Sequence, residues 1–222
     1  MLSVRHVYKS YGKHEVLKDF NMEVKKGEII GLIGENGAGK STLLKILTTL
    51  LKPSKGEIYL DGQLYRKEYK KIRKEIGYVP QDIALFEDLT VMENMKFFSK
   101  LSTVKRTESE LKEIIGSVQL TRFDTKVNDL SGGMKRKLNL AVSLIHHPKL
   151  LLLDEPTAGI DLKSRIEIGH LLKSLSVDEG KTIIYISHDM NEIEALCDRV
   201  VIIGEDDFYQ NLLSKNNETA LQ

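Results

Sequence analysis

A glycine-rich segment, Gly34 to Ser41, carries the strongest chemical signal in the sequence. It reads GENGAGKS and matches G-x-x-x-x-G-K-[ST], with an apolar run before it and a helical pattern after it. Gly34, Gly37 and Gly39 let the main chain take left-handed angles, so that successive N–H groups can point at a triphosphate. Lys40 can reach the β and γ phosphates, and Ser41 can ligate Mg²⁺. The alternative is an ordinary glycine turn before a helix, and the strand and helix around the segment argue against it.

Two adjacent acids, Asp154 and Glu155, follow the apolar run 150–153. The carboxyl end of a buried parallel strand is where open sheets bind their ligands. We therefore expect Asp154 to hold Mg²⁺ and Glu155 to polarise the attacking water. Neighbouring carboxylates repel each other unless a cation is near, so a bound metal would account for the pair. Capping of a helix before Pro156 is the alternative reading of these acids.

A third segment, Asp129 to Arg136, reads DLSGGMKR and predicts a second anion-binding surface. Ser131 can cap a helix there, and Gly132 and Gly133 expose backbone N–H groups at its positive end. Taken alone, such a cap is an ordinary structural feature.

The hydrophobic pattern predicts the strands and helices that must hold these residues. Apolar and β-branched runs bounded by turn residues predict strands at 2–8, 16–24, 28–33, 56–60, 150–154, 182–187 and 200–203. Helical spacing predicts helices at 40–51, 91–101, 108–120, 134–146, 162–179 and 190–196. Strands that alternate with helices indicate a parallel sheet covered on both faces, while the short early strands indicate an antiparallel edge layer.

The fold class that follows is α/β: a P-loop NTPase core with a mixed or parallel sheet, an antiparallel β edge layer and an inserted α-helical subdomain. We expect residues 1–89 to form the first part of the ATP-binding core and residues 90–147 the helical subdomain. Residues 148–210 would complete the core, and the polar residues 211–222 would form a C-terminal tail.

The composition excludes several classes of protein. Lys and Arg total 33 against 32 Asp and Glu, and the net charge of +1 gives no electrostatic footprint for nucleic acid. The longest apolar runs fall far short of the ~20 residues that cross a bilayer. The first residues show no secretory signal, and the single Cys197 cannot form an internal disulfide, so a cytoplasmic location is expected. The basic stretch 67–74, KEYKKIRK, is interpreted as a solvated helix face because Glu68 interrupts it.

Together these motifs resemble the nucleotide-binding domain of ATP-binding cassette (ABC) transporters from about Leu2 to Ile203, because six motifs occur in family order. Asp154 and Glu155 resemble the family's metal and catalytic acids, and His188 resembles the switch histidine that would contact the γ phosphate. The resemblance makes Lys40 part of the catalytic set and Gln81 a residue that senses Mg²⁺. The nucleotide contacts that it implies are Tyr11 on adenine, the loop Gly34, Glu35, Asn36, Gly37, Ala38, Gly39, Lys40, Ser41 and Thr42, then Gln81, the signature residues Ser131, Gly132 and Gly133, and Asp161 in the loop that crosses the dimer.

The resemblance also implies partners. In this family the signature of one subunit closes on the γ phosphate held by another, so ATP and Mg²⁺ would bind between two copies of the domain. A separate transmembrane permease would contact the helical insertion and residues 83–89, which would hold the chain on the cytoplasmic face of the cell membrane.

The motif forms LSGGM and PQDIALFEDLTVMEN look most like the branch that exports drugs, antibiotics, antimicrobial peptides or polymers. An importer or lipid-transport ATPase, a soluble cassette protein acting on ribosomes, DNA or iron-sulfur assembly, and a nucleotide-gated switch without catalysis are the alternatives. The sequence departs from the family pattern at Met134, where glutamine is most frequent, and after Val201, where the usual basic and glycine turn is missing.

Overall fold

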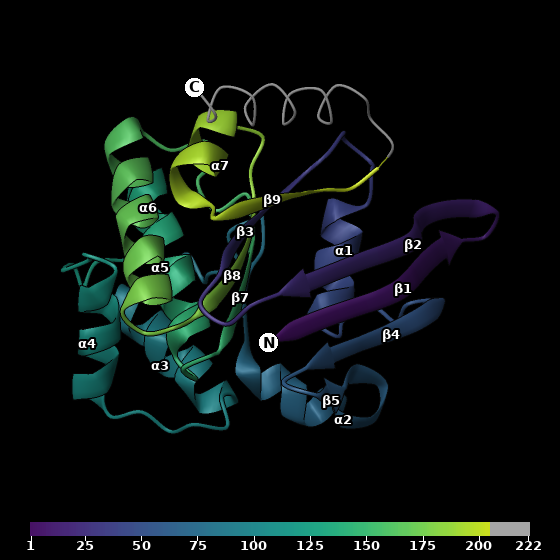
Figure 1. The fold of residues 1–222 in the computed structure, drawn as a ribbon. Helices are drawn as coiled ribbons and strands as arrows, with labels where there is room; N and C mark the ends of the chain where they lie inside the picture. The colour runs from purple at the N-terminus through teal and green to yellow at the C-terminus, as the bar shows by residue number, and fades with distance from the viewer. Residues whose placement is uncertain (205–222) are drawn as a thin grey trace.

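The computed structural model describes residues 1–204, and these residues form two sheets with helices around them (Figure 1). The predicted tail at 211–222 and the acidic segment that follows Gly204 lie outside the described residues. Within the described part of the chain, one sheet is antiparallel and the other is parallel, as the hydrophobic pattern predicts.

The antiparallel sheet has the strand order β2-β1-β4-β5. Its long strands pair through contacts such as Leu2 with Val24 on one side and Leu2 with Leu60 on the other. The turn at Asp61 and Gly62, both with positive φ, connects the last two strands. The strands of this sheet are β1 (Leu2–Tyr11), β2 (His14–Val24), β4 (Lys55–Leu60) and β5 (Gln63–Leu64).

The parallel sheet has the strand order β6-β7-β8-β3-β9. Its three central strands are buried along their whole length, as continuous apolar runs require when helices or a second sheet cover both faces. The pattern missed the short strand β6, which pairs with β7 from Ile76 opposite Leu150 to Val79 opposite Leu153. The strands are β3 (Ile29–Ile33), β6 (Ile76–Val79), β7 (Leu150–Asp154), β8 (Thr182–Ile186) and β9 (Arg199–Ile202).

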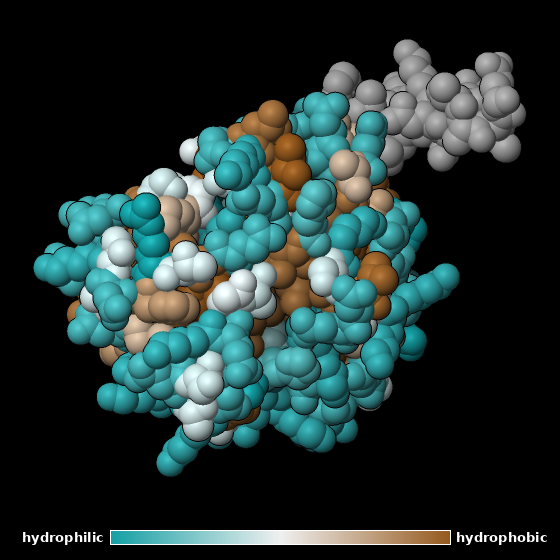
Figure 2. All heavy atoms as spheres, turned by 90° about the vertical axis from the view of Figure 1, so that its left-hand side faces the viewer, coloured by the Kyte–Doolittle hydropathy of each residue, from teal (hydrophilic) through white to brown (hydrophobic). Residues whose placement is uncertain are grey.

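Side chains that alternate along the parallel strands divide the core in two. Leu151 and Ile183 belong to the apolar cluster on the side of the helical subdomain, whereas Leu152 and Ile184 belong to the cluster beneath the antiparallel sheet and α1. Figure 1 shows this arrangement, with α3 to α6 on one side of the parallel sheet and α1 with the antiparallel sheet on the other. The helical side is seen directly in Figure 2, where apolar side chains are visible in a hollow within a mostly hydrophilic surface.

The helix α1 (Lys40–Leu47) is shorter than predicted. Helical spacing suggested an end at Leu51, but Thr49 has a φ of 61° and ends the helix by donating its N–H to the carbonyl of Ile46. Two helices follow the acid pair, α6 (Leu162–Val177) and α7 (Met190–Leu196). The basic stretch is confirmed as an exposed helix, α2 (Tyr65–Ile72), followed by a 3₁₀ turn (Arg73–Glu75).

The segment predicted as a helical insertion contains α3 (Val91–Leu101), α4 (Glu108–Ser117) and α5 (Gly132–Leu144). The first two begin with reciprocal capping boxes, Thr90 with Glu93 and Thr107 with Glu110. Each box satisfies backbone donors at the start of its helix, which is why both helices begin where they do.

Candidate functional site

The parallel sheet brings the predicted catalytic residues together at the carboxyl ends of neighbouring strands. Gln81 follows β6, Asp154 ends β7 with Glu155 directly after it, His188 follows β8, and the glycine loop joins β3 to α1. In an open α/β sheet this edge is where ligands bind. A cavity of about 440 Å³ lies there. It is lined by Asn36, Gly37, Gly39, Lys40, Ser41, Thr42, Gln81, Glu155 and His188.

The glycine loop depends on backbone angles that side chains disfavour. Gly34 has a φ of 148°, and a Cβ at this position would lie 2.2 Å from the carbonyl oxygen of Ile203. Gly39, with a φ of 108°, is the N-cap residue of α1, whose first turn contains no acidic residue. The positive end of the helix therefore faces the cavity without a carboxylate of its own helix to neutralise it, and this favours a bound anion.

Lys40 is buried beneath this loop, with 7% of its surface exposed. Its Nζ donates to the carbonyl oxygens of Gly34 at 2.6 Å and Glu35 at 2.8 Å. Burial lowers the pKa of Lys40, while the nearby carboxylates of Glu155 and Asp154 act in the opposite direction. Within the glycine loop, Ala38 donates its N–H to the carbonyl of Glu35 at 3.2 Å, and this hydrogen bond closes the turn.

Asp154 ends β7 with only 4% of its surface exposed. Burial raises the pKa of its carboxyl group above the ordinary value, and a hydrogen bond from Ser41 lowers it in part. The charge of Glu155 raises this pKa further, whereas the charges of Lys45 and Lys40 lower it. The structure thus holds the buried carboxylate of Asp154 beside the hydroxyl of Ser41, an exposed residue that lines the cavity.

The carboxylate of Glu155 lies between two predicted site residues. Its Oε1 is 3.0 Å from Nε2 of His188, and its Oε2 accepts a hydrogen bond from Nε2 of Gln81 at 3.3 Å. The backbone N–H of Glu155 donates to the carbonyl of Ile186 at 3.1 Å, which extends the β7–β8 pairing by one residue. Glu155 has a φ of 49°, an uncommon angle for a side-chain-bearing residue. This turn directs the acid away from the strand axis and into the cavity.

A buried hydrogen-bond network, which the sequence did not reveal, supports both catalytic segments. Glu192 of α7 accepts hydrogen bonds from Thr157 at 2.9 Å, Tyr185 at 2.8 Å and Ser187 at 2.7 Å. Thr157 lies two residues after Glu155, and Ser187 immediately precedes His188. One carboxylate therefore fixes the segments that carry the acid and the histidine. An acid on a short polar helix looks like a surface residue in sequence, so nothing in the pattern points to this role.

Arg136 is a second residue that sequence reasoning did not single out. Its guanidinium donates to the carbonyl of Gln81 and, at 3.3 Å, to that of Ala158. The side chain is nearly buried, with 9% of the residue exposed. Since Arg136 belongs to α5, it connects the helical subdomain to segments on both sides of Glu155. Its position one turn after Gly132, on the same helix face, was the available signal.

The second predicted anion surface lies outside the cavity. Ser131 caps α5 by accepting the N–H of Met134 at 3.3 Å, and a Cβ on Gly133 would lie 2.1 Å from Oγ of Ser164. Asp161 caps α6 through the N–H of Ser164 at 3.0 Å and its hydroxyl at 2.7 Å. The structure therefore brings Ser131, Gly132, Gly133 and Asp161 into one group, because both helix starts pack together, but does not bring this group to the glycine loop.

Tyr11 is also separate from the lining of the cavity. It lies at the end of β1 with 50% of its surface exposed, and the Nζ of Lys9 is 5.1 Å from the centre of its ring. A contact between Tyr11 and a nucleotide stays a prediction.

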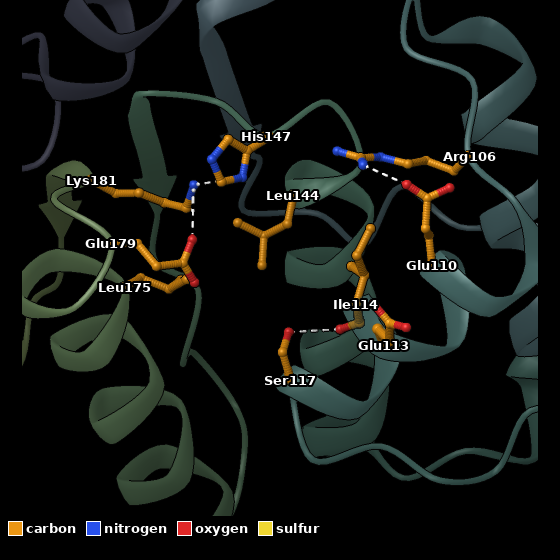
Figure 3. A pocket seen from close by; sticks show the side chains of 10 residues that line it. All are labelled: Arg106, Glu110, Glu113, Ile114, Ser117, Leu144, His147, Leu175, Glu179 and Lys181. Atoms are coloured by element: carbon orange, nitrogen blue, oxygen red, sulfur yellow. Dashed lines mark hydrogen bonds and ion pairs between the residues drawn. The ribbon is translucent and has the colours of Figure 1, made fainter.

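A further cavity, of about 260 Å³, lies between α4 and α6 (Figure 3). Its charges are paired in part: Arg106 with Glu110 at 2.9 Å and Lys181 with Glu179 at 3.2 Å. None of the predicted nucleotide-binding or catalytic residues lines this cavity. The predicted catalytic residues lie instead at the carboxyl ends of the parallel strands.

Comparison with known proteins gives a consistent result. The family model described as "ABC transporter" matches residues 17–158. The chain is 41% identical over 210 residues to the linearmycin resistance ATP-binding protein LnrL of Bacillus subtilis, covering 92% of this chain and 67% of the relative. It is 39% identical over 206 residues to the lantibiotic transport ATP-binding protein SrtF of Streptococcus pyogenes, covering 92% of this chain and 87% of the relative.

A solved structure agrees with the sequence relatives. The ATP-binding cassette MJ0796, in a dimeric post-hydrolysis state bound to ADP and Pi, superposes with a TM-score of 0.81 at 31% identity. The match covers 91% of this chain and 94% of that protein. With the glycine loop, the acid pair and the histidine converging on one cavity, these matches place the chain in the ABC transporter family, as one of its ATP-binding and ATP-hydrolysing cassettes.

Proposed function

We propose that this chain hydrolyses Mg-ATP to drive an exporter, with Glu155 directing water at the γ phosphate held by the glycine loop. The observation that carries the proposal is the position of the Glu155 carboxylate, 3.0 Å from His188 and 3.3 Å from Gln81 at the cavity that Lys40 and Ser41 line. A carboxylate that two polar side chains orient toward a phosphate-binding loop is suited to align and polarise a water molecule. His188 then positions the phosphate and does not act as the base.

Magnesium fits the residues that meet at the end of β7. The carboxylate of Asp154 and the hydroxyl of Ser41 are hard oxygen donors, and Gln81 adds an amide oxygen at the same cavity. No group of three or more His, Cys, Asp or Glu side chains within residues 1–204 could hold a metal on its own. This suits Mg²⁺, which keeps several waters and takes further ligands from substrate phosphates. When bound, the ion neutralises charge on the β and γ phosphates.

A second copy of the domain would complete the site. Ser131, Gly132, Gly133 and Asp161 form a group with exposed N–H donors at a helix start, away from the cavity of their own chain. We propose that this group binds the γ phosphate held by the other copy and that Tyr11 stacks on the adenine. A few charge-assisted hydrogen bonds of about 1.5–3 kcal/mol each would supply the roughly 5.5 kcal/mol that shifts a pair from mostly open to mostly closed.

The segment after Gln81 offers a surface for a membrane subunit. Phe86 packs against Phe97 and Phe98 of α3, with ring centres 4.7 Å and 6.0 Å away, yet Phe86 and Phe97 remain 46% and 39% exposed. Asn94 bonds both the N–H and the carbonyl of Phe86, which anchors this segment on α3. Exposed aromatic clusters of this kind are typical of protein interfaces. We propose that a separate permease contacts these aromatic side chains and holds the chain at the cytoplasmic face of the membrane. Within residues 1–204 no helix is long and apolar enough to cross a bilayer.

The names of the relatives support the direction of transport. Besides the linearmycin resistance and lantibiotic transport proteins, the chain is 40% identical to a Nod factor export ATP-binding protein of Cupriavidus metallidurans, covering 91% of this chain and 68% of that relative. One of these names refers to resistance, one to transport of a lantibiotic and one to export. We propose that the cargo is a drug, antibiotic, antimicrobial peptide or polymer that the permease selects.

Glu155→Gln tests the proposed role of the acid. The variant should bind Mg-ATP with near wild-type affinity but hydrolyse it about 10²- to 10⁴-fold more slowly, because the amide cannot accept a proton from water. It should also elute as a dimer when ATP is present. The matched control is Glu113→Gln, the same chemical change on the exposed surface of α4. Wild-type turnover in Glu155→Gln would remove this acid from the mechanism.

A further inference from the structure

A cavity unrelated to the nucleotide site lies where the end of α1, β4 and α2 meet. It has a volume of about 570 Å³, within the range that accommodates small ligands, and its lining combines apolar and basic side chains. Figure 1 shows β4, β5 and α2 grouped together, away from the helical subdomain. The lining includes Ile46, Leu51, Ile58, Leu64 and Tyr65 as the apolar part and Lys52, Lys55, Arg66 and Arg73 as the basic part.

The positive charges around this cavity are mostly unpaired. Among the described residues that line it, Glu57 is the one acid, and it already bonds Arg66 at 3.0 Å. Lys52 and Lys55 are exposed and form no ion pair within residues 1–204. Arg73 is held in place by the hydroxyl and the carbonyl of Thr49, again without a carboxylate. Three cations therefore face the solvent with no counter-charge, although the net charge of the whole chain is only +1.

The basic surface continues beyond the cavity along α2 and the 3₁₀ turn. Lys67, Lys70, Lys71 and Lys74 are exposed there. Apolar side chains are interleaved with them: Tyr69 is 41% exposed beneath the guanidinium of Arg73, and Leu50, which immediately precedes the lining residue Leu51, is 67% exposed. Within the cavity wall the hydroxyl of Tyr65 is buried without a hydrogen-bond partner. The sequence alone suggested a solvated helix face, but it could not show that Lys52 and Lys55 join the same surface from another segment.

We propose that this surface binds the headgroups of anionic phospholipids in the membrane. Clusters of four to eight Lys and Arg side chains bind acidic lipid surfaces, and exposed aromatic and leucine side chains insert at the headgroup level. The cations surround an apolar cavity, which suits an amphiphile whose phosphate meets the lysines and whose glycerol and first methylenes contact Leu51 and Ile58. The dispersal of charge over α2, the 3₁₀ turn and residues 52–55 favours an extended charged surface over a short acidic segment of a protein.

Vesicle flotation with the purified chain tests the proposal and requires neither nucleotide nor permease. Binding should be clear with vesicles that contain phosphatidylglycerol, weak with phosphatidylcholine alone, and reduced by added salt. Lys52→Gln/Lys55→Gln should weaken binding about five-fold per lysine, or roughly 25-fold in all. The matched control, Lys100→Gln/Lys105→Gln, removes the same charge from an exposed part of the helical subdomain and should bind as the wild type does. Leu50→Ser should weaken the binding that remains in high salt.

Three results would overturn the proposal. The first is equal binding to neutral and anionic vesicles, or equal losses in the two double variants. The second is a Lys52→Gln/Lys55→Gln variant that binds vesicles as the wild type does but no longer co-purifies with the membrane subunit. This result would mean that the surface binds an acidic segment of a protein. The third is tight binding of soluble glycerol phosphate that displaces the vesicles, which would make this a site for a free phosphate compound. Unchanged ATP hydrolysis and thermal unfolding in the double variants would show that a loss of vesicle binding leaves fold and proposed function intact.

Discussion

The clash at Gly34 allows a quantitative test of how the glycine loop is built. Alanine at this position would have to adopt a φ of 148° with its Cβ 2.2 Å from the carbonyl oxygen of Ile203. Backbone angles of this kind cost about 1–3 kcal/mol for a residue with a side chain. Relief of the overlap by movement of neighbouring groups costs about a further 1–3 kcal/mol. Gly34→Ala should therefore lower the free energy of unfolding by roughly 2–6 kcal/mol, a large part of the 5–15 kcal/mol typical of a domain.

Two other glycines separate the cost of the backbone angle from the cost of the steric overlap. Gly37 has a φ of 86° but would place a Cβ in open space, so Gly37→Ala should show only the backbone cost of about 1–3 kcal/mol. Gly169 lies inside α6 with neither a positive φ nor a close neighbour, so Gly169→Ala should stabilise the protein by about 0.5–1 kcal/mol.

Urea unfolding of the nucleotide-free protein measures all three variants. The expected order of stability is Gly169→Ala, wild type, Gly37→Ala and finally Gly34→Ala. The affinity of Gly34→Ala for ATP should fall as well, because the carbonyl of Gly34 positions the Nζ of Lys40. If Gly34→Ala were as stable as Gly37→Ala, the close approach of Ile203 would not constrain the loop, and the reasoning would be refuted.

Two further predictions concern carboxyl groups. Because the pKa of Asp154 is raised, ionising this buried group destabilises the metal-free fold as the pH rises through that pKa. At neutral pH the melting temperature of Asp154→Asn should therefore be no lower than that of the wild type, and the difference should disappear below the ordinary pKa of 3.8. The same variant should lose Mg²⁺-dependent ATP binding. A lower melting temperature for metal-free Asp154→Asn would contradict this. Ionisation of Glu110 has the opposite effect on stability, because the backbone N–H of Thr107 and the guanidinium of Arg106 lower its pKa from 4.5 to about 2. Glu110→Gln should therefore be less stable than the wild type at pH 7. The melting temperatures of the two proteins should converge as the pH falls from about 4.5 to about 2. A difference that stays constant over this range would show that the charge of Glu110 plays no part.

The elements that sequence could predict are those whose pattern is local. The strands predicted at 150–154 and 182–187 are apolar runs that only a sheet covered on both faces explains. The first is confirmed with its predicted bounds, and the second is confirmed but ends one residue earlier, at Ile186. The end of α1 was wrong because the left-handed turn at Thr49 has no glycine or asparagine to signal it. The strand β6 was missed because it is short and contains Gly77. A Cβ on Gly77 would lie 2.8 Å from the carbonyl of Ser143, so tertiary packing selects this glycine.

The residues of the candidate site also differ in whether a local sequence pattern could predict them. The loop 34–42 and the acids at 154 and 155 could be named from sequence, since each lies in a contiguous motif at the end of a predicted strand. Gln81 and His188 were named through the family resemblance, and the structure brings both to the same carboxylate. Arg136 and Glu192 were not found from the sequence. The partners of Arg136 are backbone carbonyls 22 and 55 residues away in the chain, and those of Glu192 are hydroxyls 5 to 35 residues away.

The carboxylate of Glu192 has a mechanical consequence. The loop after β7 and the loop after β8 have separate backbones, yet both are tied to one oxygen atom on α7, Oε2 of Glu192. A tilt of this helix of seven residues would carry the acid and the histidine in the same direction and leave the distance between them unchanged. Movement transmitted through α7 would then change how far the pair stands from the bound phosphate, so that the rate of hydrolysis could be altered from outside the cavity without disassembly of its catalytic residues.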